Sequence, residues 1–559
     1  MQPLLSAGVL ELGLGWGGPV EVVYGFLACF ALSLFLAISL AEISSPFVTA
    51  GGPYNWAGAL SGRLGKLPSY VVGWVTLLAL FGGISTSVQA SNQIMGMRMM
   101  FTYGDPASAS TQVGQWGVAQ ACNLVGVFAS LMPIEWTNRL SWITLVWLVC
   151  GSTILVILIP AVAPSRQSNA YVWGKWYNGS SAGIDQAGLG SQRSRDAYTV
   201  CNGLLMSQYL LLYYDTPSHM AEETHRSTWT VPRSIIASFL IGSAINFGLL
   251  LSFLYSIQIE SNVYTPGAGI TGTCYGGYKM NDYGTPVCTI PYSLFQTGNI
   301  FWDVFAARFP DKSGLPALNC LTGDPMTCPP RPSKRGRNGA IVCSFIVCIG
   351  ATFSTMLGYA SATRFIYSFA RDKAFPPFMN RWLVYVHPKT KVPLGAVAFF
   401  GIICAAFTCV WLNQNPVAAF SAITGMNSNG LLLVYGMAPL LRLTTGFRTF
   451  TKTKDFDLKW LSIPAAVIGV IYAMASNATI ALPSIFPITS PGGLLAGNLN
   501  FAPVGLGAVI ALALLLYPFA VKFWGFTGPM QRHEDARDGL ALQAAAKAVQ
   551  STEEGSAPA

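Results

Sequence analysis

The residues best suited to bind a charged ligand lie in the stretch 210–223, where an acidic residue stands within an apolar run. Asp215 is followed two positions later by Pro217. Proline has no N–H to donate and its ring clashes with the preceding turn, so a helix through this stretch should break just before it. The break would free backbone carbonyls near Tyr213 and Tyr214, beside the Asp215 carboxylate. The stretch therefore predicts a polar site at an interrupted helix.

Asp215 has two candidate roles in such a site. Its carboxylate can pair with an ammonium group, to which the rings of Tyr213 and Tyr214 would add cation–π contact. It can also cap the second half of the broken helix by accepting backbone N–H bonds. Capping is slightly favoured, and the two roles are compatible. The remaining charged or titratable residues of the stretch are expected at its cytoplasmic end, where water solvates them: His219, Glu222 and Glu223.

The elements that carry this stretch are predicted to be membrane-spanning helices. The chain has 559 residues, of which 52% are hydrophobic and 10% are charged, whereas a soluble domain carries about 25% charged residues. Several runs of ~20 residues have almost no charge, which is the length that crosses about 30 Å of hydrocarbon. Such runs must be helices or barrel strands, and they lack the alternation of barrel strands. A helix break at this depth is tolerated only where it lines a cavity.

The apolar runs predict eleven full crossings and one truncated segment, and together an all-α polytopic membrane protein. The short first piece is 3–16, and the longer runs are 19–42, 68–90, 113–132, 141–163, 198–225, 233–257, 339–367, 392–412, 416–441, 460–481 and 504–523. Residues 1–523 are expected to form one transmembrane domain, in which 258–338 is a long exoplasmic loop. Residues 524–559, rich in Ala, Glu and Gly, are expected to be a cytoplasmic tail.

The charge distribution indicates an orientation in a lipid bilayer and argues against nucleic acid as a partner. The net charge is +9, but Lys and Arg are spread through the loops without a long basic run. They favour the loops that are cytoplasmic when the C-terminus lies inside, although the loop 164–197 opposes this mildly. The sequon at Asn178 then falls on the exoplasmic side, as N-glycosylation requires. No basic region precedes the first apolar residues, so no cleaved secretory signal is expected.

The twelve cysteines fall into two groups. Eight lie in apolar spans, where a buried Cys usually acts as a small hydrophobic residue. The other four share the loop 258–338 and would form one or two disulfides in an oxidising compartment: Cys274, Cys288, Cys320 and Cys328. A zinc site is less favoured, because the spacings fit no finger pattern and no His lies nearby. No metal and no cofactor are expected.

Three further stretches are of interest, and each has a plain structural interpretation. Gly51-Gly52-Pro53 is expected to be a turn between helices, with the aromatic residues Tyr54 and Trp56 at the membrane interface. The stretch 361–376 is expected to be a helix leaving the membrane on the cytoplasmic side, with Arg364 extending toward water. In the tenth span, Asn427 and Asn429 could line a pathway, although hydrogen bonds between helices are favoured.

Five sets of residues occur in an order that is typical of one transporter family. They are Gly17-Gly18-Pro19 with Tyr24-Gly25; Ser39 to Glu42 with Thr49 to Gly52, Tyr54 and Trp56; Tyr214-Asp215 with His219-Met220 and Glu222-Glu223; Ser361 to Pro376; and Phe486-Pro487 with Asn498-Leu499-Asn500. Between about Gly17 and Pro529 the chain thus resembles the amino acid–polyamine–organocation transporters. The resemblance is specifically to the fungal amino acid/choline permease branch, which includes GABA, choline and polyamine permeases.

The resemblance implies a twelve-helix fold of two inverted five-helix repeats plus two further helices. Broken first and sixth helices would flank the substrate, and relative to the family the first helix is expected to lack its N-terminal half. The substrate site would comprise Tyr213, Tyr214, Asp215 and Thr216, with contributions from the third, eighth and tenth spans. Tyr213 replaces the Gly that the family has before Tyr214-Asp215. Transport would proceed by alternating access, usually driven by protons, which Asp215 or Glu222 would carry.

These observations predict a secondary active transporter, and more closely a proton-coupled symporter of a small amino acid or amine such as GABA or choline. The plasma membrane is the expected location, with the vacuolar membrane as the alternative. A second hypothesis is a non-transporting nutrient sensor or an inactive truncated permease on the same fold. An enzyme is not expected, because no nucleophile–base pair, metal cluster or phosphate-binding loop stands out.

Overall fold

The part of the chain that the structure describes is built mostly from helices. The computed structural model describes residues 4, 6–49, 51–83, 85–101, 112–178, 191–258, 278–280, 286–288, 296–311, 332–388, 390–412, 416–447, 450, 452–453, 455–483, 489–490, 493–494 and 500–529. Its strands form two antiparallel two-stranded ladders, which are β1 (Tyr278–Met280) with β2 (Pro286–Cys288) and β3 (Thr489–Ser490) with β4 (Gly493–Leu494).

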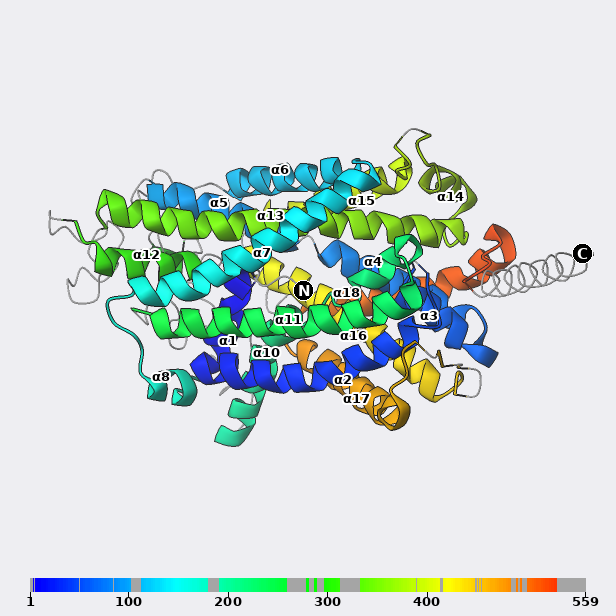
Figure 1. The fold of residues 1–559 in the computed structure, drawn as a ribbon, viewed down its shortest axis with the longest axis horizontal. Helices are drawn as coiled ribbons and strands as arrows, with labels where there is room; N and C mark the ends of the chain where they lie inside the picture. The colour runs from blue at the N-terminus through cyan, green and yellow to red at the C-terminus, as the bar shows by residue number, and fades with distance from the viewer. Residues whose placement is uncertain are drawn as a thin grey trace, which may run out of the picture.

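Most of the long helices run lengthwise along the molecule and lie side by side (Figure 1). The helices of the first half are α1 (Ser6–Val20), α2 (Phe26–Ser44), α3 (Pro53–Leu60), α4 (Leu67–Gly82), α5 (Ser85–Phe101), α6 (Gln112–Ser130), α7 (Ile134–Val162), α8 (Asn169–Gly174), α10 (Gln192–Leu210) and α11 (Ser227–Ser256). Those of the second half are α12 (Gln296–Arg308), α13 (Lys334–Arg371), α14 (Pro377–Leu383), α15 (Leu394–Thr408), α16 (Pro416–Leu443), α17 (Ser462–Ile480) and α18 (Phe501–Phe519).

Shorter 3-10 and π segments join or extend these helices. The 3-10 segments are η3 (Gly62–Leu64), η5 (Thr216–Glu223), η8 (Cys409–Leu412) and η9 (Lys459–Leu461), and the π segments are η2 (Glu21–Gly25) and η11 (Ala520–Trp524). Two of them, η2 and η5, interrupt apolar segments rather than end them, and both bear on function below.

Seven helical segments in the described part of the chain are long and apolar enough to cross a membrane: Leu12–Ser44, Leu67–Arg98, Glu135–Val162, Ser227–Ser256, Lys334–Arg371, Lys459–Ile480 and Phe501–Trp524. The prediction of a helical, multi-span protein is confirmed at this level. The other predicted runs also coincide with helices, namely α1, α6, α10, α15 and α16. They fall short of a span for three reasons: α1 and α15 have 15 residues each, α10 ends at a break, and α6 and α16 carry several polar side chains.

The connecting segments gather at two opposite ends of the bundle. Figure 1 places α8 and α12 at one end, which we call the α8 end, and α3 and α14 at the other, which we call the α14 end. Helices α8 and α12 belong to loops predicted to be exoplasmic, and α3 and α14 belong to loops predicted to be cytoplasmic. Their positions at opposite ends agree with the predicted alternation of the spans. Which solution each end faces stays a prediction.

The α1–α2 turn lies at the α8 end, and glycine and proline produce it. Gly18 has φ 69°, a left-handed conformation that glycine adopts without strain, and Pro19 follows it. The turn is held by two backbone bonds, from the Val20 N–H to the Lys175 carbonyl (3.4 Å) and from the Tyr177 N–H to the Gly17 carbonyl (3.3 Å). The predicted boundary between the runs 3–16 and 19–42 falls at this turn.

The start of the predicted tail is docked at the α14 end. Phe526 is buried, with its ring centroid 5.0 Å from that of Tyr70. The Lys66 ammonium donates to the Phe526 carbonyl (3.2 Å), and the Thr527 N–H donates to the Asp372 carbonyl (3.2 Å). Residues 530–559 lie outside the described residues. So do the side chains of the four loop cysteines predicted to form disulfides.

A buried ion pair ties the end of α2 to the end of α16. The Arg442 guanidinium lies 2.6 Å from the Glu42 carboxylate, and both side chains are buried. Arg442 also donates to the Ser462 hydroxyl and stacks over the Phe450 ring at 4.2 Å. Lys452 approaches Glu42 at 3.7 Å from a more exposed position. The guanidinium thus has hydrogen-bonding, ionic and aromatic partners at once, as a buried charge requires.

We expect Arg442→Met to destabilise the protein by about 3–5 kcal/mol, because it leaves the Glu42 carboxylate buried without its main partner. The matched variant Lys452→Met removes the exposed partner of the same carboxylate and should cost less than about 1 kcal/mol. Thermal unfolding of both variants in one detergent measures the difference. Equal losses would contradict the assignment of Arg442 as the principal partner.

Candidate functional site

The sixth apolar segment is broken, as the position of Pro217 predicts. Helix α10 ends at Leu210, residues 211–215 are irregular, and the 3-10 segment η5 follows. Tyr213, at the position where glycine was expected, has φ 64°. A non-glycine residue in this region costs about 1–3 kcal/mol and persists only where its surroundings hold it. The tyrosine therefore adopts the backbone conformation that glycine would adopt without strain.

The backbone groups near the break have partners close by in the chain. The Thr216 hydroxyl donates to the Tyr213 carbonyl (2.8 Å), and the Ser218 N–H donates to the Asp215 carbonyl (2.7 Å). The Leu211 N–H completes the last turn of α10 by donating to the Ser207 carbonyl (3.2 Å). Free carbonyls were predicted near Tyr213 and Tyr214, and the structure shows that the Tyr213 carbonyl accepts a hydrogen bond, as does that of Asp215. Side chains of the break therefore remain the groups best placed to contact a ligand.

Asp215 occupies the cap position of η5, but its side chain makes no capping bond. The favoured capping interpretation is therefore wrong. Asp215 is 4% exposed, and its side chain turns toward other groups instead. The Tyr435 hydroxyl of α16 donates to Oδ1 at 2.5 Å, and the His219 ring nitrogen Nε2 lies 3.4 Å from Oδ2. Capping fails because these two side chains hold the carboxylate away from the η5 backbone.

A cavity of about 220 Å³ lies against the break. The sixth segment contributes Tyr213, Asp215, Thr216 and His219 to its wall. The remaining lining residues come from α4, α5, α7, α13, α15, α16 and the connections between them: Thr76, Leu80, Gly83, Thr86, Thr144, Leu148, Ser354, Thr355, Leu357, Gly358, Tyr359, Ser361, Phe400 and Leu431. One carboxylate and one imidazole thus face a wall that is otherwise made of hydroxyl and apolar groups.

The two tyrosines of the break point in different directions. Tyr213 lines the cavity and donates through its hydroxyl to the Asn427 side-chain oxygen of α16 (2.8 Å). This contact confirms the preferred interpretation of Asn427 as a hydrogen-bonding link between helices. Tyr214 is 1% exposed and does not line the cavity; its ring packs against Phe239 and Tyr435, at 5.4 and 4.9 Å between centroids. Contact of both rings with one ligand would therefore need a rearrangement.

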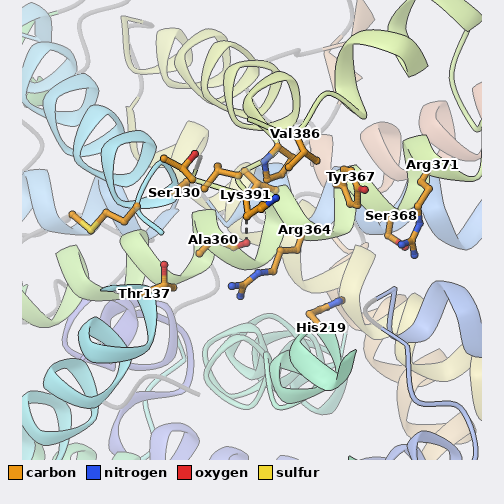
Figure 2. Close-up of a pocket in the computed structure, with 15 residues that line it drawn as sticks. Ser130, Thr137, His219, Ala360, Arg364, Tyr367, Ser368, Arg371, Val386 and Lys391 are labelled. Atoms are coloured by element: carbon orange, nitrogen blue, oxygen red, sulfur yellow. Dashed lines mark hydrogen bonds between the residues drawn. The ribbon is translucent and has the colours of Figure 1, made fainter. Parts of the chain in front are cut away.

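A second cavity of about 330 Å³ adjoins the first toward the α14 end, and His219 lines both. Figure 2 shows His219 at its edge, with Arg364, Tyr367 and Arg371 contributed by α13. His219 is 5% exposed, so the expectation that water solvates it is wrong. Arg364 is half-buried and faces this cavity. The second cavity thus has basic side chains on its wall, and an imidazole separates it from the first.

The glycine turn between α2 and α3 packs directly on η5. Gly52 has φ 52°, and a methyl group on it would lie 2.7 Å from the Ser218 hydroxyl oxygen and 3.0 Å from a His219 ring carbon. Tyr54 and Trp56 are fully buried, so the prediction of an interfacial position is wrong. Their burial follows from packing, because the Tyr54 ring lies between α13 side chains and its hydroxyl donates to Asp372 (3.0 Å).

Other predicted residues can be placed only in part. The Asn178 side-chain amide donates to Asp196 (2.8 Å), and its oxygen accepts from the Thr199 hydroxyl (3.0 Å). These contacts do not test glycosylation of Asn178, which stays a prediction. The side chain of Glu222 lies outside the described residues. No group of three His, Cys, Asp or Glu that could hold a metal ion occurs among the residues that the structure describes.

Sequence reasoning missed Tyr435 and Glu21. Tyr435 lies in an apolar stretch of α16 and carries no local signal of its role, which depends on a partner 220 positions away. Glu21 had a signal, because an ionisable residue within a predicted span is a functional candidate by default. It is 4% exposed, and its carboxyl oxygen Oε1 has no hydrogen-bond partner in the described part of the chain.

Comparison with known proteins identifies relatives across nearly the whole chain. The family model for amino acid permeases matches residues 4–281 and 333–511. The amino-acid permease BAT1 of Arabidopsis thaliana is 26% identical over 525 residues, which cover 93% of this chain and 88% of the relative. A Macrophomina phaseolina protein named as an amino acid/polyamine transporter is 25% identical over 491 residues, or 86% of this chain and 91% of that protein. The thiamine transporter thi9 of Schizosaccharomyces pombe is 21% identical over 524 residues, or 90% and 77%.

The close approach of Gly52 to η5 predicts that Gly52→Ala destabilises the protein more than Gly65→Ala. The two glycines have nearly the same backbone, with φ 52° and ψ −130° at Gly52 and φ 64° and ψ −136° at Gly65. Alanine is therefore strained alike at both, but a methyl group at Gly65 meets nothing within 4 Å. Overpacking should add about 1–3 kcal/mol at Gly52.

Thermal unfolding of the two alanine variants in the same detergent checks this prediction, with Gly65→Ala as the matched control for backbone strain. If the two midpoints fall by the same amount, the turn does not press on Ser218 and His219.

Proposed function

The chain belongs to the amino acid permease family, and from that premise we propose that it is a proton-coupled symporter of a small amino acid or amine. Members of this family are multi-pass membrane transporters and not enzymes. The proposal goes further in naming a proton as the driving ion and substrates such as GABA or choline, as in the fungal amino acid/choline permeases. It also places the chain in the plasma membrane, with the α14 end and the C-terminus in the cytoplasm.

The proposed fold is the twelve-helix arrangement of two inverted five-helix repeats followed by two helices. In this arrangement α10 and η5 are the two halves of the sixth helix, and residues 211–215 are its break. The break lies beside α4, α13 and α16, which correspond to the third, eighth and tenth spans and contribute to the cavity wall. These contacts support the proposal, because discontinuous helices at the junction of repeats form the substrate sites of many secondary transporters.

The observation that carries the proposal is the Asp215 carboxylate at the break. It is buried, it faces the first cavity, and it has a hydroxyl and an imidazole as neighbours but no Lys or Arg among the lining residues. An ammonium group entering the cavity would supply the missing countercharge, and the ring of Tyr213 at the wall would add cation–π attraction. Thr216 offers a hydroxyl on the same wall.

The size of the cavity supports a small substrate. Sites for drug-sized ligands measure about 300–1,000 Å³, whereas this cavity measures about 220 Å³. The adjoining cavity at the α14 end offers a path of exit once His219 moves, since that imidazole lines both spaces. In an alternating-access cycle, movement of η5 and the glycine turn at Gly52 would open and close this path.

Uptake of labelled GABA, choline, putrescine and a mixed amino acid set by permease-deficient yeast cells tests the proposed function. We expect saturable uptake of at least one of these compounds, abolished by a protonophore, in cells whose surface carries the chain. Surface arrival is measured separately in every culture. Surface arrival without uptake of any compound would contradict the proposal and favour the sensor or an inactive permease.

We expect Asp215→Asn to lose uptake by about 100-fold or more, because a buried charge that loses its partner costs about 3–5 kcal/mol. The control is Asp457→Asn, a similar neutralisation at an exposed carboxylate paired with Lys452 (2.7 Å). The Lys452 ammonium lowers the pKa of Asp457, and neither residue lines the cavity. Retained uptake in Asp215→Asn would remove Asp215 from the substrate site.

A further inference from the structure

A symporter that binds an ammonium group at Asp215 needs a second acid for its proton. One carboxylate cannot hold a proton and form an ion pair with an ammonium group at the same moment. The inference that follows rests on the proposed function, and it concerns a carboxyl group at the α8 end of the molecule. Glu21 lies in the π segment η2, just after the α1–α2 turn at the α8 end.

Glu21 is enclosed by glycines. A methyl group on Gly17 would lie 2.3 Å from the Glu21 Cβ, one on Gly203 would lie 2.5 Å from its Cγ, and one on Gly25 would lie 2.8 Å from its Oε1. The Glu21 side chain therefore fits only because three surrounding positions are glycines. Two of them lie four residues before and after it, and the third lies on α10. The carboxyl is buried, and Oε1 has no hydrogen-bond partner among the described residues.

Among the described residues, the ionisable groups that interact with Glu21 carry no positive charge. They are the thiols of Cys29 on α2 and Cys201 on α10. The Lys175 ammonium lies over the Tyr171 ring at 5.0 Å, and the Trp176 ring packs at Gly17. Between positions 234 and 254, helix α11 contains no acidic, basic, Cys or Tyr residue. On α1, the side chain of Glu11 lies outside the described residues.

We propose that Glu21 is the proton-binding acid of the transport cycle and that the proton reaches it from the α8 end. A buried carboxylate needs a cation or strong hydrogen-bond donors, and the described residues around Glu21 supply neither, so η2 can close against α10 only when Glu21 carries a proton. Proton binding is thereby linked to α10, whose far end leads into the break at residues 211–215. Glu21 acts on the substrate through α10 and does not touch it.

A line of proton-carrying groups leads from Glu21 toward the substrate cavity. The Glu21 carboxyl oxygen Oε1 lies against Gly25, and Cys29 follows Gly25 by one helical turn. Cys29 lies beside Tyr472 of α17. Tyr472 and then Tyr214 continue the line, and in this conformation neither hydroxyl has a hydrogen-bond partner among the described residues. The Tyr214 ring packs on that of Tyr435, which donates to Asp215. In the proposed transfer, Glu21 gives up its proton and becomes a carboxylate. Transfer requires the Tyr472 and Tyr214 hydroxyls to turn toward their neighbours; each S–H or O–H group then passes one proton on and receives one. His219, beside Asp215, accepts the last proton, because Asp215 is paired with the ammonium group.

The first test is an infrared titration of the full-length chain in detergent, which needs no substrate. The wild-type spectrum should contain a protonated-carboxyl band that is lost as pH rises and is absent in Glu21→Gln. Glutamine keeps the size of the side chain and cannot ionise. If the same band persists in Glu21→Gln, it comes from another residue and the inference is overturned.

The second test compares two kinds of transport in proteoliposomes, with the labelled compound that gives uptake in the yeast panel. Accumulation driven by a proton gradient should be lost in Glu21→Gln, whereas exchange of labelled for unlabelled compound should persist, because exchange needs no net proton movement. Tyr472→Phe should reduce gradient-driven accumulation in the same way. The matched control is Cys201→Ala, which faces Glu21 from α10 but lies off the line and should retain both activities.

The outcomes separate this inference from the proposed function. Gradient-driven accumulation that survives in Glu21→Gln overturns the inference and leaves a proton-coupled transporter in place. Wild-type accumulation that is the same with and without a proton gradient overturns the proton-coupled part of the proposed function. Loss of exchange together with accumulation in Glu21→Gln, with surface arrival intact, would assign Glu21 a structural role and also overturn the inference.

Discussion

A helix that is interrupted at membrane depth must satisfy its backbone within the protein, because hydrocarbon supplies no hydrogen-bond partners. In this chain the constraint falls on residues 211–215. It is met locally by the bonds from Thr216 and Ser218 and by the left-handed turn at Tyr213. The side chains of the break can then reach other helices, and both Tyr213 and Asp215 bond to α16. The position of α16 relative to the sixth segment therefore determines the shape of the cavity and the surroundings of its one carboxylate.

The α14 end is organised around the same segment. The glycine turn at Gly52 lies on η5, and the next helix, α3, is anchored through the bond from Tyr54 to Asp372 at the end of α13. The carbonyl of Asp372 in turn accepts from Thr527, so the residues that follow α18 join the same contact. A movement of η5 would thus disturb α3, α13 and the segment 525–529 together. This connection gives a physical reason for a cooperative change at the α14 end.

Apolar run length and proline chemistry are local properties, and they were sufficient to predict a helical, multi-span protein and the break before Pro217. They did not separate α5 from the run 68–90. The orientation of Tyr214 and the partners of Asp215 were not predictable, because they depend on Phe239 and Tyr435, which the fold brings from distant parts of the sequence. Tyr54 and Trp56 were misplaced for a related reason, since an aromatic side chain suits a lipid interface and a protein core equally well. Glu21 could have been found from its charge within an apolar span, but its enclosure by Gly203 is a tertiary feature.

The winding of η5 has a mechanical consequence. Eight residues in a 3-10 conformation form a long segment of this kind, since such runs rarely exceed about four residues. A 3-10 helix rises about 2.0 Å per residue and an α-helix about 1.5 Å, so rewinding Thr216–Glu223 as an α-helix would shorten it by about 4 Å. The same change would turn its last residues by about 160° around the axis. A change of winding in this segment would therefore carry His219 along the axis and turn it, and the contacts of Gly52 with Ser218 and His219 would pass this movement to the α2–α3 turn.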